Sequence, residues 1–599
     1  MNFFKIFIAT FLSILISTVL MVTLLVGSIV GLVMGSGSIV TVESESVLVI
    51  DLYEPIVDTP ETNILSSINL RELTIDAKIT TLDAIRAIEI AALDDKIKGI
   101  CIRPNPSSTV SMAILEELRN EIERFKGEGK FVVAYADTYS QGGYYLASVA
   151  DSLYLQPEGS VVWQGVASTP MFYKGLFDKL DIGVEVFRPT SCLYKSAVEP
   201  LTRSFMSPEN REQSEALVAS VWSSVVDDVS HSRQLADSQL NKYANSLCGF
   251  ISSEAQSVGL VDDLIYEDEL ELRLRDFGVK LNSHGRANRV TLSEYISAAT
   301  TQLQLSQGGS AGDVAVIYAE GTIVDGEGDM DEVGSSTLVG LIREAKDDDK
   351  IKSVVIRVNS PGGSALASDV IWREVSLLRQ QKPVVVSMGG YAASGGYYIS
   401  AAADVILADR LTITGSIGVY GILFDIEGTL SKKLGITTDV SKSNSSADFM
   451  RTSRPITSTE RAIMTRSVDQ VYDTFTTHVS NGRNLSMERV HNLAQGRVWS
   501  GADAEDLGLV DGIGGLKMAI LIAAERGGVS QDFTIRELIP VADDLSALFK
   551  PISSYASSYM SARSGDIFAQ HYNQLLKSLR PLQAKRGVIM FSPVRVEWR

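Results

Sequence analysis

Cysteine and histidine are scarce in this chain of 599 residues, which contains three cysteines and five histidines. The cysteines, Cys101, Cys192 and Cys248, are odd in number and widely spaced, so they form neither a CxxC pattern nor a dense disulfide framework. No two histidines stand at metal-ligand spacing on an expected helix, which argues against a zinc site. We therefore expect chemistry that uses no metal and no other cofactor.

Positive charge is also in short supply, because 54 lysines and arginines stand against 73 aspartates and glutamates and give a formal net charge of −19. A protein that binds nucleic acid needs a basic face to displace counterions from the phosphates, so we expect no nucleic-acid partner. The hydrophobic share of 45% and the charged share of 21% are typical of globular proteins and exclude disorder and collagen-like repeats. At roughly 150 residues per domain, the length would allow about four domains.

Charge is absent altogether between Lys5 and Glu43, and residues 6–34 are almost wholly apolar. About 20 such residues span the hydrocarbon core of a bilayer, whereas a cleavable signal peptide has an apolar region of roughly 7–15 residues. The length of the run favours an uncleaved transmembrane anchor, although the small residues at 35–38 leave processing there open. Because Lys5 precedes the run and acidic residues follow it, we expect the large body of the chain to lie outside the cytoplasm.

The body of the chain contains one pattern twice. Three segments of the first half return in the same order in the second: residues 96–103 as 350–357, 142–145 as 395–398, and 259–262 as 508–511. This order argues against chance and indicates two homologous halves. We expect five segments: a cytoplasmic end with the transmembrane anchor (1–42), a first, degenerate half (43–300), a linker (301–312), a second half (313–543) and a C-terminal extension (544–599). The extension has no counterpart in the first half and is interpreted as an interaction segment or a surface-packed tail.

Within each half, short β-branched runs alternate with helical patterns. In the second half, the runs at 314–317, 353–356 and 384–386 are typical of buried strands, and residues 336–346 and 368–378 have helical spacing. Strand–helix–strand alternation predicts an α/β fold with largely parallel strands and right-handed crossovers.

The second half carries two turns where chemistry could take place. The loop at 359–364 holds Gly362 and Gly363, whose small size lets backbone N–H groups approach a developing oxyanion. Ser394 follows another expected strand and precedes a helix of small residues. Such a turn displays a nucleophile and directs the next N–H, that of Gly395, at developing negative charge. A turn of small residues also occurs for packing alone.

The first half lacks both features. Ser394 aligns with Gln141, and the glycine-containing loop aligns with residues 105–109, which hold no glycine pair. Two copies of one fold should need a packing device equally, so the difference between them indicates function. We therefore expect one active site per chain.

A serine nucleophile needs a base. The histidines nearest to Ser394 in the sequence, His478 and His491, lie in an expected helical segment more than eighty positions further on. A histidine brought in by folding could serve, and so could a lysine whose pKa is lowered by burial. The residues alone leave this choice open.

Five short motifs resemble those of the signal peptide peptidase A (protease IV) family: residues 194–200 (YKSAVEP), 206–208 (MSP), 359–363 (NSPGG), 394–396 (SGG) and 414–418 (TGSIG). The apolar N-terminal run and the tandem halves are similar to the long, membrane-anchored form of that family. The resemblance therefore covers nearly the whole chain. It implies tandem crotonase/Clp-protease-like domains, and a serine endopeptidase of the bacterial inner membrane that degrades cleaved signal peptides with a Ser/Lys dyad.

The resemblance also implies roles for single residues. Ser394 would be the nucleophile, and Lys195 from the other half would be the general base. Ser416 would orient this base, and Gly395 with Gly362 or Gly363 would donate to the oxyanion. Signal peptides and other short apolar peptides are the implied substrates. The implied partners are the lipid bilayer, through residues 6–34, and further copies of the chain in a homotetramer.

Other interpretations remain open. Lys442, close to the second-half counterpart of Lys195, is a competing base, and Ser416 could simply satisfy backbone groups at a tight turn. Tyr397 and Tyr398 occur in both halves, which favours a structural role.

Two other functions fit part of the pattern. A crotonase-type acyl-CoA hydratase or isomerase is disfavoured by the exported body and the serine on the turn, and a catalytically silent membrane scaffold is disfavoured by the intact motifs of the second half.

Overall fold

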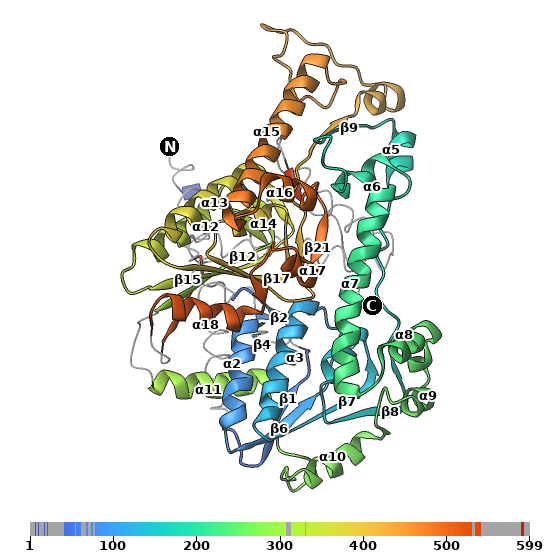
Figure 1. Cartoon of the computed structure of the whole chain (residues 1–599), viewed down its shortest axis with the longest axis vertical. Coiled ribbons are helices and arrows are strands. Elements are labelled where there is room, and N and C mark those ends of the chain that lie inside the picture. The colour runs from blue at the N-terminus through green and yellow to red at the C-terminus, as the bar shows by residue number, and fades with distance from the viewer. Residues whose placement is uncertain are drawn as a thin grey trace.

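In the computed structural model, each half of the chain forms one mainly parallel β-sheet covered by helices (Figure 1). The structure describes residues 41–53, 55–60, 78–306, 313–329, 331–529, 533–540 and 589–591, together with 68–69, 74–75 and a few positions between 6 and 21. Within these residues no helix is both long enough and apolar enough to cross a bilayer. The anchor predicted at 6–34 lies, apart from those few positions, outside the described residues, and so does most of the extension at 544–599.

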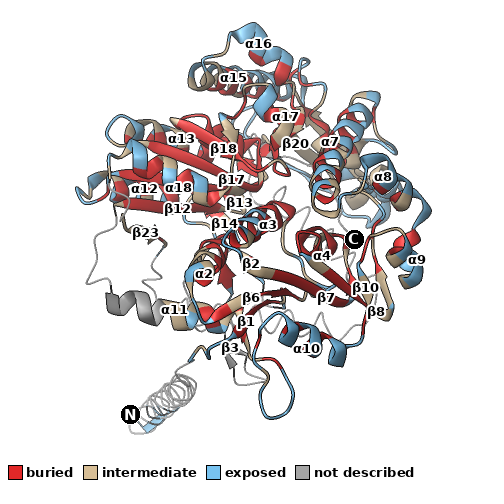
Figure 2. Ribbon diagram, turned by 60° about the horizontal axis from the view of Figure 1, so that its bottom comes forward, coloured by how far each residue is buried: buried red, intermediate tan, exposed pale blue. Residues whose placement is uncertain are grey.

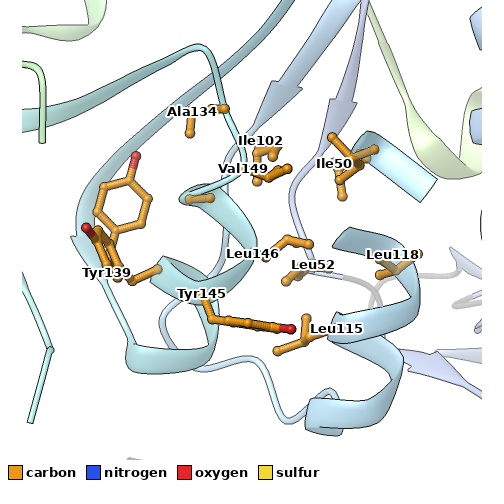
Figure 3. Packing of buried hydrophobic residues seen from close by; sticks show 14 of the residues in the cluster. Ile50, Leu52, Ile102, Leu115, Leu118, Ala134, Tyr139, Tyr145, Leu146 and Val149 are labelled. Atoms are coloured by element: carbon orange, nitrogen blue, oxygen red, sulfur yellow. The ribbon is translucent and has the colours of Figure 1, made fainter. Parts of the chain in front are cut away.

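The sheet of the first half has six strands, and every pairing within it is parallel. In spatial order the strands are β10 (Asp263–Leu264), β8 (Ser152–Val161), β7 (Phe131–Tyr139), β6 (Ile97–Ile102), β1 (Ser46–Ile50) and β11 (Arg289–Thr291). Helices α2 (Thr81–Leu93), α3 (Met112–Gly127) and α4 (Gln141–Ala147) connect β1, β6, β7 and β8 in turn. Leu115 of α3 lies against Tyr145 of α4 in the core beside the sheet (Figure 3).

The sheet of the second half repeats this plan with eight strands. Its main path is β21 (Val498–Ser500), β19 (Ile413–Gly415), β17 (Val384–Ala393), β15 (Ser353–Ser360), β12 (Val314–Glu320) and β23 (Ile535–Leu538). Off this path, β18 (Val405–Ala408) pairs with β17, and β22 (Gly512–Ile513) pairs with β18. All pairings are parallel except that of β19 with β21. The predicted α/β class with largely parallel strands is therefore confirmed.

The elements predicted for the second half are present. Three of its strands begin at the predicted positions, because their β-branched residues are buried between layers of helices. The predicted helices are α12 (Ser335–Asp347) and α13 (Ala365–Arg379). The stretch expected as a linker is partly helical, because α11 (Leu292–Ser306) continues into it. Neither glycine nor proline interrupts the chain between Leu292 and Gly308.

A pair of long helices marks the internal repeat outside the sheets. Helices α7 (Pro208–Arg233) and α15 (Ser458–Arg483) have 26 residues each and occupy corresponding positions in the two halves. Each begins at a hydroxyl cap: the side chain of Ser207 accepts the N–H of Asn210, and that of Thr457 accepts the N–H of Glu460. In Figure 2 the strands and inner helix faces are buried, whereas the outer faces of these helices are exposed.

Tyrosines of the two halves also correspond. The hydroxyl of Tyr144 donates to the carbonyl of Leu260, and that of Tyr397 donates to the carbonyl of Leu509. Both rings are buried, so each ties its helix to the distant Gly-Leu-Val-Asp segment of its own half. These contacts agree with the structural role expected for Tyr397.

The two halves are joined by charge pairs and by one ribbon. The guanidinium of Arg357 on β15 is fully buried and contacts Asp58 at 2.9 Å and Glu117 at 2.6 Å, both from the first half. Strand β20 (Gly421–Asp425) pairs antiparallel with β9 (Gly183–Phe187) of the first half. A buried charge that loses its partner is costly, so these pairs fix how the halves face one another. The loop after β9 thereby reaches the second half.

Candidate active site

Ser394 lies at the sharp turn between β17 and α14 (Gly395–Ser400) and is fully buried in this structure. Its φ of 58° is positive, a conformation that costs a non-glycine residue about 1–3 kcal/mol. The turn is held by the Ser394 N–H, which donates to the carbonyl of Gly415 at 2.8 Å, and by the Ser394 carbonyl, which accepts the N–H of Tyr398 at 2.9 Å. At the corresponding helix of the first half, the cap residue Ser140 has an ordinary φ of −63°. Of these two corresponding turns, only that of the second half has this strained conformation.

Lys195 lies in the loop between β9 and the 3-10 turn η1 (Ser196–Val198) of the first half. Its Nζ is 2.7 Å from Ser394 Oγ, 2.9 Å from Ser416 Oγ and 2.9 Å from the Ser416 carbonyl oxygen. The side chain is fully buried. The structure therefore brings together three of the residues that the resemblance singled out, from two loops of the second half and one of the first.

Burial lowers the pKa of Lys195 to about 7, since the charged ammonium loses its hydration; the nearby Cys192 is the smaller influence and opposes this shift. Among the described residues, no carboxylate pairs with Lys195. A neutral amine has two N–H groups and one lone pair. The two oxygens of Ser416 match the N–H groups, and the Ser394 hydroxyl matches the lone pair. The geometry thus fits an amine that can accept a proton from Ser394.

Ser416 follows β19 with a φ of 51°. Its N–H donates to the carbonyl of Arg497 at 2.7 Å, which fixes the backbone beside the lysine. Its Oγ accepts from Lys195 and lies 3.5 Å from the carbonyl oxygen of Gly496, to which it can donate. Ser416 therefore links the amine to a third segment of the chain, residues 495–497.

Gly496 is a residue that the sequence analysis missed. Its φ is 80°, and a Cβ placed on it would stand 2.5 Å from Lys195 Cβ and 2.7 Å from Lys195 Cα. Its N–H donates to the carbonyl of Ile417 at 2.8 Å, and the neighbouring Gln495 carbonyl accepts the N–H of Tyr194 at 3.0 Å. The segment 495–497 therefore holds the loops of Lys195 and Ser416 against each other. Counted back from the shared Gly-Leu-Val-Asp motif, Gly496 aligns with Leu247 of the first half, a difference that could have drawn attention to it.

Gln213 of α7 is a second residue that the sequence did not indicate. Its Nε2 donates to the Tyr194 carbonyl and to Ser196 Oγ, each at 2.8 Å, and so holds the residues on both sides of Lys195. Its Oε1 accepts the N–H of Val498 at 3.3 Å. This buried amide connects the lysine loop to β21.

The glycines predicted as oxyanion donors meet beside Ser394. A Cβ placed on Gly395 would stand 3.1 Å from the Gly362 Cα and 3.1 Å from the Gly363 nitrogen, so only glycine allows this approach. Gly362 has a φ of 105°, and its N–H donates to Ser360 Oγ at 3.2 Å. The Gly362 N–H is thus engaged by Ser360 in this structure.

The alternative bases lie elsewhere. Lys442 is partly exposed, and its Nζ pairs with Asp448 at 2.7 Å. His478 stacks on Trp372, with ring centroids 3.4 Å apart, and its Nε2 lies 3.3 Å from an oxygen of Asp369. His491 packs near the ring of Tyr472.

The corresponding turn of the first half is filled by Gln141. The carbonyl oxygen of this buried side chain accepts the N–H groups of Gln164 and Gly165 at 3.1 and 2.9 Å, and its amide donates to the Gly165 carbonyl at 3.0 Å. The loop that corresponds to the Ser416 loop is therefore tied directly to the helix start.

Comparison with models of known protein families identifies the family of this chain. The family model described as Peptidase family S49 matches residues 124–282 and 376–530, one range in each half, and that described as Clp protease matches residues 309–415. The chain belongs to peptidase family S49. The two matched ranges confirm the internal repeat, and the second match agrees with a Clp-protease-like fold.

Three relatives extend the similarity over most of the chain. Protease 4 of Haemophilus influenzae is 37% identical over 516 residues, which cover 84% of this chain and 82% of the relative. Protease 4 of Salmonella typhi is 36% identical, and the match covers 83% of this chain and 81% of the relative. The chloroplastic serine protease SPPA of Arabidopsis thaliana is 32% identical, and the match covers 78% of this chain and 68% of the relative. The chain is a serine protease of this S49 family, as the resemblance to signal peptide peptidase A implied. An acyl-CoA hydratase and a silent scaffold are accordingly set aside.

Proposed function

We propose that this S49 protease hydrolyses peptides with a dyad of Ser394 and Lys195, one residue from each half of the chain. The observation that carries the proposal is the 2.7 Å contact between Lys195 Nζ and Ser394 Oγ in a buried site where the pKa of the lysine is lowered to about 7. Near neutral pH a substantial fraction of the amine is then neutral and can act as a base.

The reaction follows from the contacts. Lys195 takes the Ser394 hydroxyl proton while Oγ attacks the carbonyl carbon of the scissile bond. The N–H of Gly395, with that of Gly363 or Gly362, donates to the resulting oxyanion. The Lys195 ammonium, oriented by Ser416, then gives its proton to the departing amine, and an ester on Ser394 remains. Water attacks this ester while Lys195 again takes a proton. Lys195 then returns this proton to Ser394 Oγ as the bond from Oγ to the acyl carbon breaks, and the product leaves as a carboxylic acid.

We further propose that the substrates are cleaved signal peptides and other short apolar peptides, and that the protein is anchored in the bacterial inner membrane by residues 6–34 and works as a homotetramer. The uncharged run of the N-terminal region supports the anchor. The resemblance to signal peptide peptidase A supports the substrate class and the assembly.

Labelling with a serine-reactive acylating probe tests the dyad. We expect mass spectrometry to find the adduct on Ser394 and to find none in Ser394→Ala, whose peptide hydrolysis should be lost. Ser376→Ala, a substitution on α13 outside the described site, is the matched control and should be labelled and active. Labelling of a different residue, or hydrolysis by Ser394→Ala at the wild-type rate, would contradict the proposal.

Proteolysis of spheroplasts tests the orientation. Because positive charge precedes residue 6 and acidic residues follow residue 42, added protease should digest the body beyond Glu43 without lysis. A cytoplasmic marker protein should resist digestion until the cells are lysed. Complete protection of the body in intact spheroplasts would exclude an extracytoplasmic active site.

A further inference from the structure

A short strand from the end of the chain lies on the oxyanion loop. Strand β24 (Ile589–Phe591) pairs antiparallel with β16 (Gly362–Ser364), in a small sheet with the order β14 (Glu332–Gly334), β13 (Thr322–Val324), β16 and β24. The partners are Gly362 with Phe591, Gly363 with Met590, and Ser364 with Ile589. In the described part of the chain, β24 is thus the outer strand on an edge that carries two predicted oxyanion residues.

The backbone of Met590 lies against the oxyanion loop. A Cβ placed on Gly362 would be 2.2 Å from the Met590 carbonyl oxygen and 2.8 Å from the Gly395 nitrogen. The Met590 carbonyl therefore lies beside the glycines that border Ser394. Met590 itself has no exposed surface and belongs to the hydrophobic cluster of the second half. The side chain of Met590 is thus an apolar group buried in the core of the second half, while its backbone lies against the oxyanion loop.

This arrangement is how an extended peptide binds to the open edge of a sheet. Main-chain hydrogen bonds along the edge supply affinity, and a pocket for a side chain supplies selectivity. A peptide whose scissile carbonyl is to reach Ser394 and the oxyanion glycines must pass along the same edge. Since β24 already lies there, the two cannot be bound together.

We propose that β24 is an intramolecular competitor of the substrate: residues 589–591 occupy the peptide-binding edge of the active site, with Met590 in the position of a substrate side chain. The proposal rests on the proposed function, because the edge is the substrate site only if Ser394 and the glycines perform the chemistry. A tethered competitor lowers the fraction of molecules able to bind substrate. If the edge is free in about one molecule in ten, the apparent KM is raised about tenfold while kcat is unchanged.

The test is Met590→Asp in the full-length chain. A carboxylate cannot enter a buried apolar position without a large desolvation cost, so β24 should leave the edge. We expect KM for a short apolar peptide to fall several-fold, toward the tenfold limit above, at constant kcat. The matched control is Met487→Asp, because this methionine is partly exposed at the first position of α16 (Met487–Leu493), where an acidic residue is tolerated. Its KM should stay at the wild-type value.

A synthetic peptide of residues 587–595 provides the second measurement, which does not depend on how the variant folds. Competitive inhibition of the wild-type protein by this peptide, or its cleavage, supports the proposal, and the same peptide with aspartate at position 590 should be inert. An unchanged KM in a folded Met590→Asp protein, together with a peptide that neither inhibits nor is cleaved, would overturn it. If Ser394→Ala is inactive in that case, the dyad stands and only the competitor is refuted.

Discussion

Lys195 and Ser394 are 199 positions apart in the chain, and their side chains form a 2.7 Å hydrogen bond in the buried space between the two halves. Neither half of the chain holds both residues, so each depends on the other half for its partner. The charge pairs of Arg357 and the ribbon of β9 with β20 hold the halves in the position that this contact needs.

Replacing the lysine tests its role as base. Lys195→Ala should be folded but lower kcat by about 10²–10⁴, the usual contribution of a general base. Lys195→Arg should be equally poor, since a guanidinium stays protonated and cannot accept a proton. Lys442→Ala, which removes the competing lysine, should keep most of its peptide hydrolysis. Full turnover by Lys195→Ala would rule out the dyad.

The pH dependence of kcat/KM should report the amine. Because the base must be neutral and the pKa of Lys195 is about 7, activity should rise with pH through about 7 and level off above it. Ser416→Ala removes an acceptor that stabilises the ammonium, so the rising limb should move to lower pH while kcat falls. If the rising part of the pH profile of kcat/KM does not move in Ser416→Ala, Ser416 has only a structural role.

Gly496→Ala should disturb the position of the lysine. The added Cβ would meet Lys195 Cβ at 2.5 Å, and misplacement of a catalytic group by about 1 Å can cost roughly 10² in rate. We expect a loss of kcat of that order and a displaced pH limb, with a smaller change in KM. Gly528→Ala is the matched control, since Gly528 also has a positive φ, 65°, but its Cβ would meet no atom within 4 Å. Equal kcat values for the two variants would contradict the positioning role.

Restoring a serine to the first half should not create a second active site. In Gln141→Ser/Ser394→Ala the new hydroxyl has no lysine beside it, and the loop at 105–109 has no glycine pair. The Gln141 side chain also holds Gln164 and Gly165, so its removal should loosen that turn. Peptide hydrolysis should remain at the level of Ser394→Ala alone. A rate near that of the wild type would disprove the single-site interpretation.

Asp409 should make stability depend on pH. It is buried, and one of its carboxylate oxygens has no hydrogen-bond partner. Burial, with Glu117 and Glu116 nearby, raises its pKa well above the ordinary value, although Arg357 opposes the shift. A carboxyl whose folded-state pKa is raised contributes stability at low pH that is lost as the pH rises through that pKa.

Asp409→Asn cannot ionise and should therefore raise the melting temperature at pH 8, with a gain that shrinks toward pH 4. Asp268→Asn, on the surface of α10 (Glu267–Asp276), serves as the control and should change the melting temperature little at either pH. A lower melting temperature for Asp409→Asn at pH 8 would mean that the ionised carboxylate stabilises the fold.

Much of the fold could be predicted from the sequence because it depends on local patterns. The β-branched runs that became β12, β15 and β17, and the periodic stretches that became α12 and α13, follow from which residues can be buried in a strand or on one helix face. The repeat itself directed attention to Ser394, because position 141 of the other copy holds glutamine.

The sequence by itself determined the two-half α/β plan and the turn that displays Ser394, since hydrophobic periodicity and small residues act over a few positions. Only the tertiary structure decided which lysine is dehydrated beside it, because burial of an amine is produced by segments that are distant in the chain. The tertiary structure was likewise needed to find the contacts of Gly496 and Gln213 and the pairing of β24 with β16. Each is a contact across loops whose separation in sequence carries no information about their distance in space.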